Sequence, residues 1–448
     1  MTRTLLLGLA VALMPATAHA QTTVPETLTL EDALRIARAN NPEYLQILND
    51  EDVASSGVRQ AWGSLLPTVN SSVNWRLGSN TTVTGEDDFG QPVRLDDPIT
   101  FRSSGSSQGI NANMTLFDGG QNLRQLSLAR AEVRSADARS ASRLTTLVVT
   151  VTHQFYEAVR SMRLVEVERQ NLETAQERLA QTEAQFGIAT VSQVDVLGAR
   201  RSVLDAERTL RNQEADAYRQ RLLLAFIMGV EPATTFELET AVPQVFDPSA
   251  LEEQALVDRA LQVHPLLREA EAAVATARAN SSVARGTRWP SVSGGFGFSR
   301  GASSSDFRTF GEINPLNHGW NASLGLSLPL FTGFETSHRI EVAETNERDA
   351  LLDQRRTTLL VEQEIRVALA DLRANYEALQ LADQIAELAS QRLSMAEEQY
   401  RVGALDFLQM QQLIDDNLNA QRQSVDAQFT FIRARATLEE KLAAPIQP

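Results

Sequence analysis

The chain has 448 residues, a net charge of −16 at pH 7 and an aromatic content of 6 %. This acidic balance argues against nucleic acid as a partner, because neutralising phosphates requires clustered lysine and arginine. The chain contains no cysteine, which excludes disulfides, thiolate metal sites, a cysteine nucleophile and a lipidated N-terminal cysteine.

Residues 1–20 have the pattern of a secretory signal peptide. Arg3 precedes an apolar run from Leu5 to Met14, and Ala18-His19-Ala20 supplies the small residues of a cleavage site. A buried helix or a short membrane anchor is the alternative, but the run is too short to cross a bilayer. No later stretch has about 18 consecutive apolar residues, so we expect an exported chain that enters a membrane only as strands.

The sequence contains two copies of one unit. Ala37–Pro42 recurs as Ala260–Pro265, a shift of 223 residues, and Leu116–Gly119 recurs as Leu330–Gly333, a shift of 214 residues. The difference is expected in two polar stretches predicted as loops, 79–108 and 301–319. We therefore predict a signal peptide (1–20), a first repeat (21–228), a mid-height connector (229–250), a second repeat (251–442) and a C-terminal tail (443–448).

The longest element of each copy is a helix with apolar residues at three-then-four spacing. Glu335 to Val402 is predicted to be one unbroken helix, and Gly120 to Phe186 is its counterpart. At a rise of about 1.5 Å per residue, each is a rod about 100 Å long. A second apolar row on the later helix, including Leu381 and Leu388, offers surface to neighbours on two sides. Shorter helices return over Ser192–Met228 and Asp406–Leu442.

Four segments between the helices change from a period of 3.6 to a period of 2. These predicted strands are Thr68–Leu77, Ile110–Phe117, Val292–Ser299 and Trp320–Leu328. Each has about 8 to 11 residues, the length of a tilted membrane-spanning strand, although a soluble sheet with one buried face is the alternative. All four tryptophans lie at or near a strand end, as a membrane-interface belt requires: Trp62, Trp75, Trp289 and Trp320.

Four strands are too few to close a barrel in a membrane. An open sheet edge in lipid leaves backbone groups unsatisfied, so the chain must form oligomers. Two chains would supply eight strands and three would supply twelve, and both even numbers are allowed.

The order and spacing of several short motifs resemble the TolC family of outer-membrane efflux and secretion ducts. They are the duplication, A-L-x-x-A-x-x-x-N-P over Ala33–Pro42, L-F-D-G-G over Leu116–Gly120, and Y-x-x-G over Tyr400–Gly403. The resemblance implies a mostly α-helical homotrimer, in which long antiparallel coiled-coil helices form a periplasmic α-barrel. Two amphipathic β-hairpins per chain would contribute to a twelve-stranded outer-membrane β-barrel in contact with lipid. The periplasmic tips would dock to an adaptor protein of an inner-membrane transporter.

The resemblance also implies functional residues at the turns between long and returning helices. Val402-Gly403-Ala404 matches the docking motif for the adaptor, whereas the first copy, Gly187-Ile188-Ala189-Thr190, has its glycine displaced. Asp195 falls where the family has an aspartate lining a closed entrance, with Gln409 at the second-copy position and Tyr400 nearby. One ring of three carboxylates would then form the gate. The alternative is capping-box chemistry, since Ser192 and Asp406 occupy helix N-cap positions three residues before Asp195 and Gln409.

No catalytic constellation is present in the sequence. The five histidines are scattered, and no H-E-x-x-H, P-loop or G-x-S-x-G motif occurs. We therefore predict a non-enzymatic exit duct without cofactor or metal, which is passive, opens on adaptor docking and serves tripartite efflux or type I secretion. The alternatives are a periplasmic adaptor, expected to have a single helical hairpin between β-rich domains, and a soluble structural coiled coil.

Overall fold

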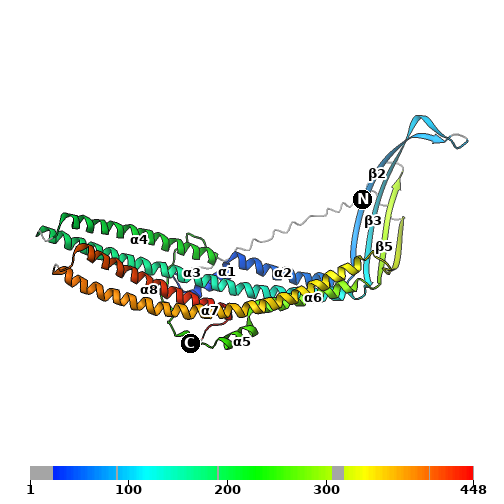
Figure 1. Ribbon diagram of the computed structural model, residues 1–448. Coiled ribbons are helices and arrows are strands. Elements are labelled where there is room, and N and C mark those ends of the chain that lie inside the picture. Colours follow the sequence, from blue (N-terminus) through cyan, green and yellow to red (C-terminus); the bar gives the residue numbers. More distant parts are fainter. Residues whose placement is uncertain (1–23, 87–88, 189–190, 305–316, 403, 447–448) are drawn as a thin grey trace.

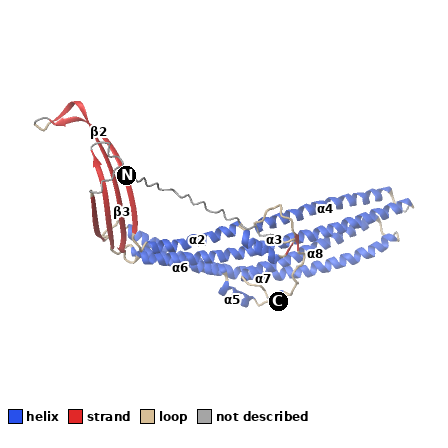
Figure 2. Ribbon diagram, turned by 180° about the vertical axis from the view of Figure 1, so that it is seen from behind, coloured by secondary structure: helices blue, strands red, loops and turns tan. Residues whose placement is uncertain are grey.

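The structure, a computed structural model, describes residues 24–86, 89–188, 191–304, 317–402 and 404–446. Its helices form one elongated bundle, with a sheet at one end and, at the other, the turns that join each long helix to its returning helix (Figure 1). The view from behind shows the same separation of strands and helices (Figure 2). The predicted signal peptide over 1–20 and the tip residues Ala189, Thr190 and Gly403 lie outside the described residues.

Each half of the chain builds the same series of elements. The first half contains α1 (Leu30–Asn40), α2 (Pro42–Gly63), β2 (Thr68–Glu86), β3 (Pro92–Phe117), α3 (Gln121–Gly187) and α4 (Gln193–Met228). The second half contains α5 (Glu253–Val263), α6 (Pro265–Gly286), β5 (Ser291–Ser304), β6 (His318–Ser327), α7 (Glu335–Arg401) and α8 (Phe407–Leu442). A shift of 223 residues superposes the bounds of α1 and α2 on those of α5 and α6, and a shift of 214 does so for the later helices.

The long helices α3 and α7 each run for 67 residues without interruption, as their apolar spacing predicts. Neither contains a proline, so no internal hydrogen bond is lost. The shorter helices lie end to end along them, α2 and α4 against α3, and α6 and α8 against α7. Proline at the first position of α2 and α6 follows the N-caps Asn41 and His264 and separates each from the preceding short helix. The two halves join where α3 contacts α6 and α8.

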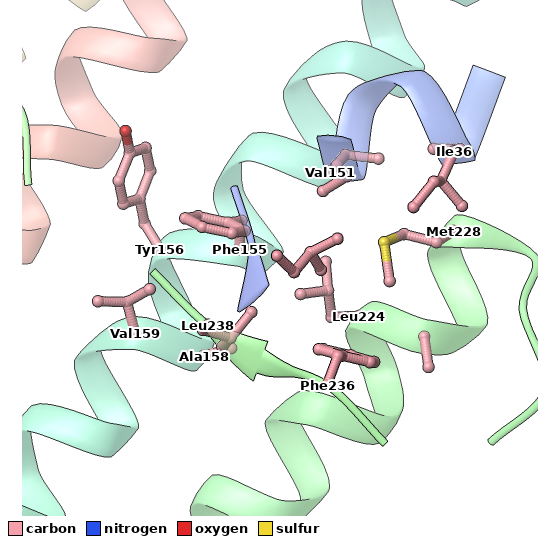
Figure 3. Packing of buried hydrophobic residues seen from close by; sticks show 14 of the residues in the cluster. Ile36, Val151, Phe155, Tyr156, Ala158, Val159, Leu224, Met228, Phe236 and Leu238 are labelled. Carbon is pink, nitrogen blue, oxygen red and sulfur yellow. The ribbon is translucent and has the colours of Figure 1, made fainter. Parts of the chain in front are cut away.

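The largest buried apolar cluster lies at mid-length, where α1, α3, α4 and α8 meet the connector (Figure 3). The rings of Phe155 and Tyr156 on α3 pack edge to face, with 5.6 Å between the ring centres. Burying each such side chain contributes about 1.5–3 kcal/mol. The connector contributes Phe236 to this core. Its short strand β4 (Glu237–Leu238) pairs in parallel with β1 (Thr27–Leu28). The short 3-10 helix η1 (Pro248–Ala250) follows later in the connector. A second cluster around Ile365, Leu369 and Leu438 holds α7 to α8 beside it.

The four strands form one antiparallel sheet in the order β2-β3-β5-β6. The two hairpins share one register, because Thr68 pairs with Asn113 and Ser291 pairs with Ser327, which are the same positions after the repeat shifts. The strands of the first hairpin extend well beyond the predicted ten residues. The expected loop over 79–108 was wrong, because its threonines and its segment Ile99–Phe101 have high β-propensity and continue the ladder.

Candidate functional site

One face of the sheet is apolar across all four strands in the rows nearest the helices, and it becomes polar on β3 and β5 where Gln108 and Arg300 lie beside Val73. In the observed register, Ala112 lies between Val69 and Phe296, and Phe296 lies opposite Ala322. Leu324 and Leu326 on the edge strand are about three-quarters exposed in the single chain. An exposed apolar face of this breadth is typical of a surface that contacts a membrane or a protein partner. Its other members are Val73, Trp75, Leu77, Ile110, Met114, Phe298 and Trp320.

The opposite face carries asparagine, serine and glycine. Gly297 lies between Asn111 and Asn321, and a Cβ added at Gly297 would stand 2.5 Å from the Asn321 Oδ1 atom. At Gly295 the nearest atom would be Ser323 Oγ, at 2.8 Å. The glycines of β5 therefore leave room for hydrogen-bonding side chains of the strands on either side. Such a face is suited to contact with water.

Three of the four tryptophans lie near a strand end. Trp62 is the penultimate residue of α2 and Trp289 precedes β5, so both lie where the helices meet the sheet, and Trp320 is close to the start of β6. Trp75 differs from the prediction, since it lies inside the 19-residue strand β2. The reason is that the polar continuation of β2 keeps pairing with β3 beyond Leu77. Their role as an interface belt stays a prediction.

The other end of the bundle exposes apolar side chains at matching positions of the two copies. Ile188 and Val402 are each 73 % exposed, and Val194 and Leu408 are exposed to a similar extent. The members of each pair are related by the shift of 214 residues. Gly187 and Ala404 are exposed beside them. The predicted docking residues that the structure describes are thus all accessible.

Asp195 closes a capping box at the start of α4. Its Oδ2 atom accepts hydrogen bonds from the Ser192 backbone N–H at 2.9 Å and from the Ser192 hydroxyl at 2.7 Å. The Ser192 Oγ in turn accepts from the Asp195 N–H. In the second copy, Asp406 accepts from the Gln409 N–H at 2.8 Å, and the Gln409 side chain is exposed. Helix capping is therefore a role that Asp195 already has in the single chain.

Tyr400 lies in the core of the second hairpin rather than on its surface. It is 6 % exposed and packs with Ala396, Met410 and Ile414. The guanidinium of Arg178 on α3 stands 5.6 Å from the centre of its ring. Tyr400 therefore connects α7 to α3 near the tips.

Arg178 is a residue that sequence reasoning missed. Burial lowers the pKa of its guanidinium, and Glu397, at 3.7 Å, opposes that shift. Within the described part of the chain, the Arg178 Nε and Nη1 atoms and the Tyr400 hydroxyl are buried without a hydrogen-bond partner. A lone arginine on a helix resembles a surface residue, and no local pattern indicates that its partners lie over 200 positions away.

A cleft of about 620 Å³ separates α4 from α8 near the tips, with α3 as its floor. Ser202 of α4 donates to Gln411 of α8 at 3.2 Å across it, and Arg178 and Arg422 line it. Among the residues described, no helix combines the length and apolarity needed to span a bilayer. The same residues include no cluster of three or more His, Cys, Asp or Glu side chains that could hold a metal.

A family model for outer membrane efflux proteins matches residues 33–230 and 256–444. The chain belongs to the outer membrane efflux protein family. This efflux protein is 29 % identical over 362 residues to Protein CyaE of Bordetella pertussis, a match covering 78 % of the chain and 70 % of the relative. It is 25 % identical over 408 residues to the outer membrane protein TolC of Vibrio cholerae, a match covering 89 % of this chain and 85 % of that relative. The resemblance to the TolC family is confirmed.

Solved structures of outer-membrane channels share the fold of this efflux protein. CusC superposes with a TM-score of 0.74 at 17 % identity, over 93 % of this chain and 92 % of CusC. The CmeC outer membrane channel of Campylobacter jejuni gives 0.73 at 14 % identity, over 92 % and 85 %. The efflux protein is therefore an outer membrane channel protein, mostly helical with a few antiparallel strands, and is not an enzyme.

Proposed function

We propose that three copies of this chain form a passive exit duct, with a twelve-stranded β-barrel in the outer membrane and an α-barrel in the periplasm. The proposal is carried by the sheet, which has one apolar and one polar face and whose edge strands β2 and β6 pair with no further strand in the described residues. Three sheets joined edge to edge leave no open edge, turn the apolar face to lipid and enclose the polar face around water.

The helices support the same closure. Their order across the bundle is α4, α3, α8, α7, since α3 contacts α4 and α8, and α8 contacts α7. The outermost helices both keep exposed apolar rows, which include Leu204 and Phe226 on α4 and Leu381 and Leu388 on α7. Packing α7 of one copy against α4 of the next buries both rows and closes a ring of twelve helices. This use explains the second apolar row of α7.

The tips are the proposed contact for a periplasmic adaptor. Exposed apolar side chains in matching positions, such as Ile188 and Val402, are suited to burial by a protein partner. The adaptor would connect the duct to an inner-membrane transporter that supplies the energy, and docking would splay the tip helices apart. Relatives are named for pyoverdine export, for toluene efflux and for cation efflux, which fits one duct design serving pumps with different cargo.

Export through the signal peptide and the absence of a lipid anchor complete the proposal. The deciding experiment combines the mass of the purified protein in detergent with single-channel conductance in planar bilayers. We expect a stable trimer and small, ion-selective openings. A monomer without conductance, soluble in the absence of detergent after signal removal, would overturn the duct in favour of an adaptor or a soluble coiled coil.

A further inference from the structure

Two glycines allow the first repeat to pack tightly against the second at the base of the sheet. A Cβ added at Gly119, before α3, would lie 2.3 Å from the Trp289 Cβ atom, in the turn before β5. A Cβ added at Gly286, which ends α6, would lie 2.9 Å from Arg124 Nη1 and 3.4 Å from the Gln121 Cβ atom on α3. No larger residue fits at Gly119 without displacing a neighbour.

Equivalent glycines lie on the two outer edges of the chain, where the residues that would pack against them are not supplied by the described part of the same chain. Gly333 is the second-copy equivalent of Gly119, and Gly63 is the first-copy equivalent of Gly286. Apart from the adjoining residues and the backbone of the same helix, no atom of the described residues lies within 4 Å of where a Cβ on either would stand. Leu66, which occupies the position of Trp289, is 64 % exposed. Each outer edge therefore carries one half of the inter-repeat contact.

Both halves are preformed although no described residue covers them. Gly333 has a φ of +60° against +70° at Gly119, and Phe334 keeps the left-handed conformation of Gly120, with a φ of +68° against +78°. Packing around the turns is also repeated. Ala61, Leu126 and Ala129 form a cluster between α2 and α3, and the equivalent Ala284, Ile340 and Ala343 form one between α6 and α7. Residues related by the repeat shifts therefore have the same backbone conformation and the same packing in the two repeats.

The strands supply the register of the missing contact. Inside the chain, β3 pairs with β5 so that Asn113 lies opposite Gly295 and Ala112 opposite Phe296. We infer that β6 of one copy pairs with β2 of a second copy in this same register, which places Leu326 opposite the partner's Val73 and seats Gly333 against the partner's Leu66. The inference rests on the proposed duct and names its subunit joint. By the same shifts, Gly63 contacts the start of the partner's α7.

The pleat of the sheet agrees with this register. Leu326 and Leu324 lie on the apolar face, and the residues placed opposite them, the partner's Val73 and Trp75, lie on the apolar face of β2. A slip by one residue would set each apolar side chain opposite a polar one. The proposed ring thus contains six joints of the same kind. Three are the β3–β5 contacts within the chains, and three are the β6–β2 contacts between neighbouring chains.

Cysteine pairs test the register, because the chain has no cysteine of its own. In Leu326→Cys/Val73→Cys the paired Cα atoms would lie about 4.5–5.5 Å apart, within disulfide range. Mild oxidation should give a covalent trimer on a denaturing gel. The shifted pair Leu326→Cys/Trp75→Cys, at about 7–8 Å, should give far less. Ala112→Cys/Phe296→Cys should form its bond within one chain and serves as the positive control.

A substitution at Gly63 tests the glycine contact. Gly63→Gln has free space in the single chain, but would place a side chain in the joint, so we expect loss of the trimer. Gly57→Gln is the matched control, since Gly57 lies on the same helix in open space and its second-copy equivalent, Asn280, is exposed. Equal trimer yields for the two variants would overturn the contact.

The outcomes separate this inference from the duct itself. A conducting trimer in which the shifted pair links and Leu326→Cys/Val73→Cys does not would overturn the register and leave the duct standing. A monomer without conductance would overturn the duct, and the joint with it.

Discussion

The Nε atom of Arg422 on α8 donates a 2.6 Å hydrogen bond to the Oε1 atom of Glu168 on α3. The carboxylate side chain is only 4 % exposed, whereas the arginine is 31 % exposed. This contact joins the two repeats, because α3 belongs to the first and α8 to the second. Arg433 makes a second contact of this kind, at 3.0 Å from Glu157. These ion pairs thus add directional contacts between α8 and α3 to the apolar packing of Phe429 and Ile432.

Replacing Arg422 should destabilise the protein strongly. Arg422→Leu leaves the buried Glu168 charge unpaired, and loss of one partner of a buried pair costs about 3–5 kcal/mol, with the partial exposure of Arg422 favouring the lower end. The double variant Glu168→Leu/Arg422→Leu should lose less, since no buried charge remains. The midpoint of thermal unfolding at a fixed scan rate measures both. Arg169→Leu, which breaks the exposed pair with Glu166, is the control and should change stability by less than about 1 kcal/mol.

Equivalent helix ends carry different residues in the two repeats, which predicts stability changes of opposite sign. Gly229 and Ala443 both end a returning helix in the left-handed conformation, with φ of 71° and 49°. An L-residue there costs about 1–2 kcal/mol, so Ala443→Gly should stabilise by about 1 kcal/mol. Gly229→Ala should destabilise by at least about 2 kcal/mol, because its Cβ would also lie 2.3 Å from the Asn40 carbonyl oxygen. A loss of stability in Ala443→Gly, measured by denaturant titration, would contradict this account.

The parts of the fold that depend on local pattern could be predicted from the sequence. The extents of α3 and α7 follow from apolar spacing without proline, and the two sheet faces follow from alternation. The length of β2 could not be predicted, because a run of Thr, Ser and Asn forms a strand only when a partner strand supplies the ladder. The contact of Arg178 with Tyr400 was also inaccessible, because it depends on how the two hairpins pack. Local chemistry therefore determined the helices and the two sheet faces, and long-range packing determined the length of β2 and the contact of Arg178 with Tyr400.

Because a histidine, His264, is the N-cap of α6, we expect the protein to lose stability in mild acid. His264 Nδ1 accepts from the Leu266 N–H at 3.2 Å, which requires a neutral ring. Burial lowers the pKa of His264, Lys441 on α8 lowers it further, and Glu364 on α7 opposes them. Because the folded pKa lies below the unfolded value of about 6.5, the unfolded chain takes up the proton first as the pH falls. The contribution of the neutral His264 cap to the free energy of unfolding is therefore full above about pH 6.5 and is lost as the pH falls below that value.

His264→Asn should reduce this acid sensitivity. Asn41 caps the equivalent helix of the first repeat, accepting from the Tyr44 N–H at 2.9 Å, so asparagine can replace the cap without titrating. Denaturation midpoints near neutral pH and near pH 5 should differ less in the variant than in the wild type. Some dependence should persist, since burial also lowers the pKa of His153. A pH dependence in His264→Asn equal to that of the wild type would contradict the prediction.

Asp195 distinguishes a gate from a cap through ion selectivity. Its carboxylate accepts two capping hydrogen bonds from Ser192, a role that leaves room for three copies to place a ring of carboxylates at the entrance. Asp195→Asn should lower the cation selectivity of single channels, with a cost in stability below about 1 kcal/mol from the weakened cap. Asp406→Asn removes the same charge from the other tip and leaves a competent N-cap, so it should change selectivity less. If Asp195→Asn conducts with unchanged selectivity, its carboxylate serves the helix start alone, and the closed entrance has no charged ring at this position.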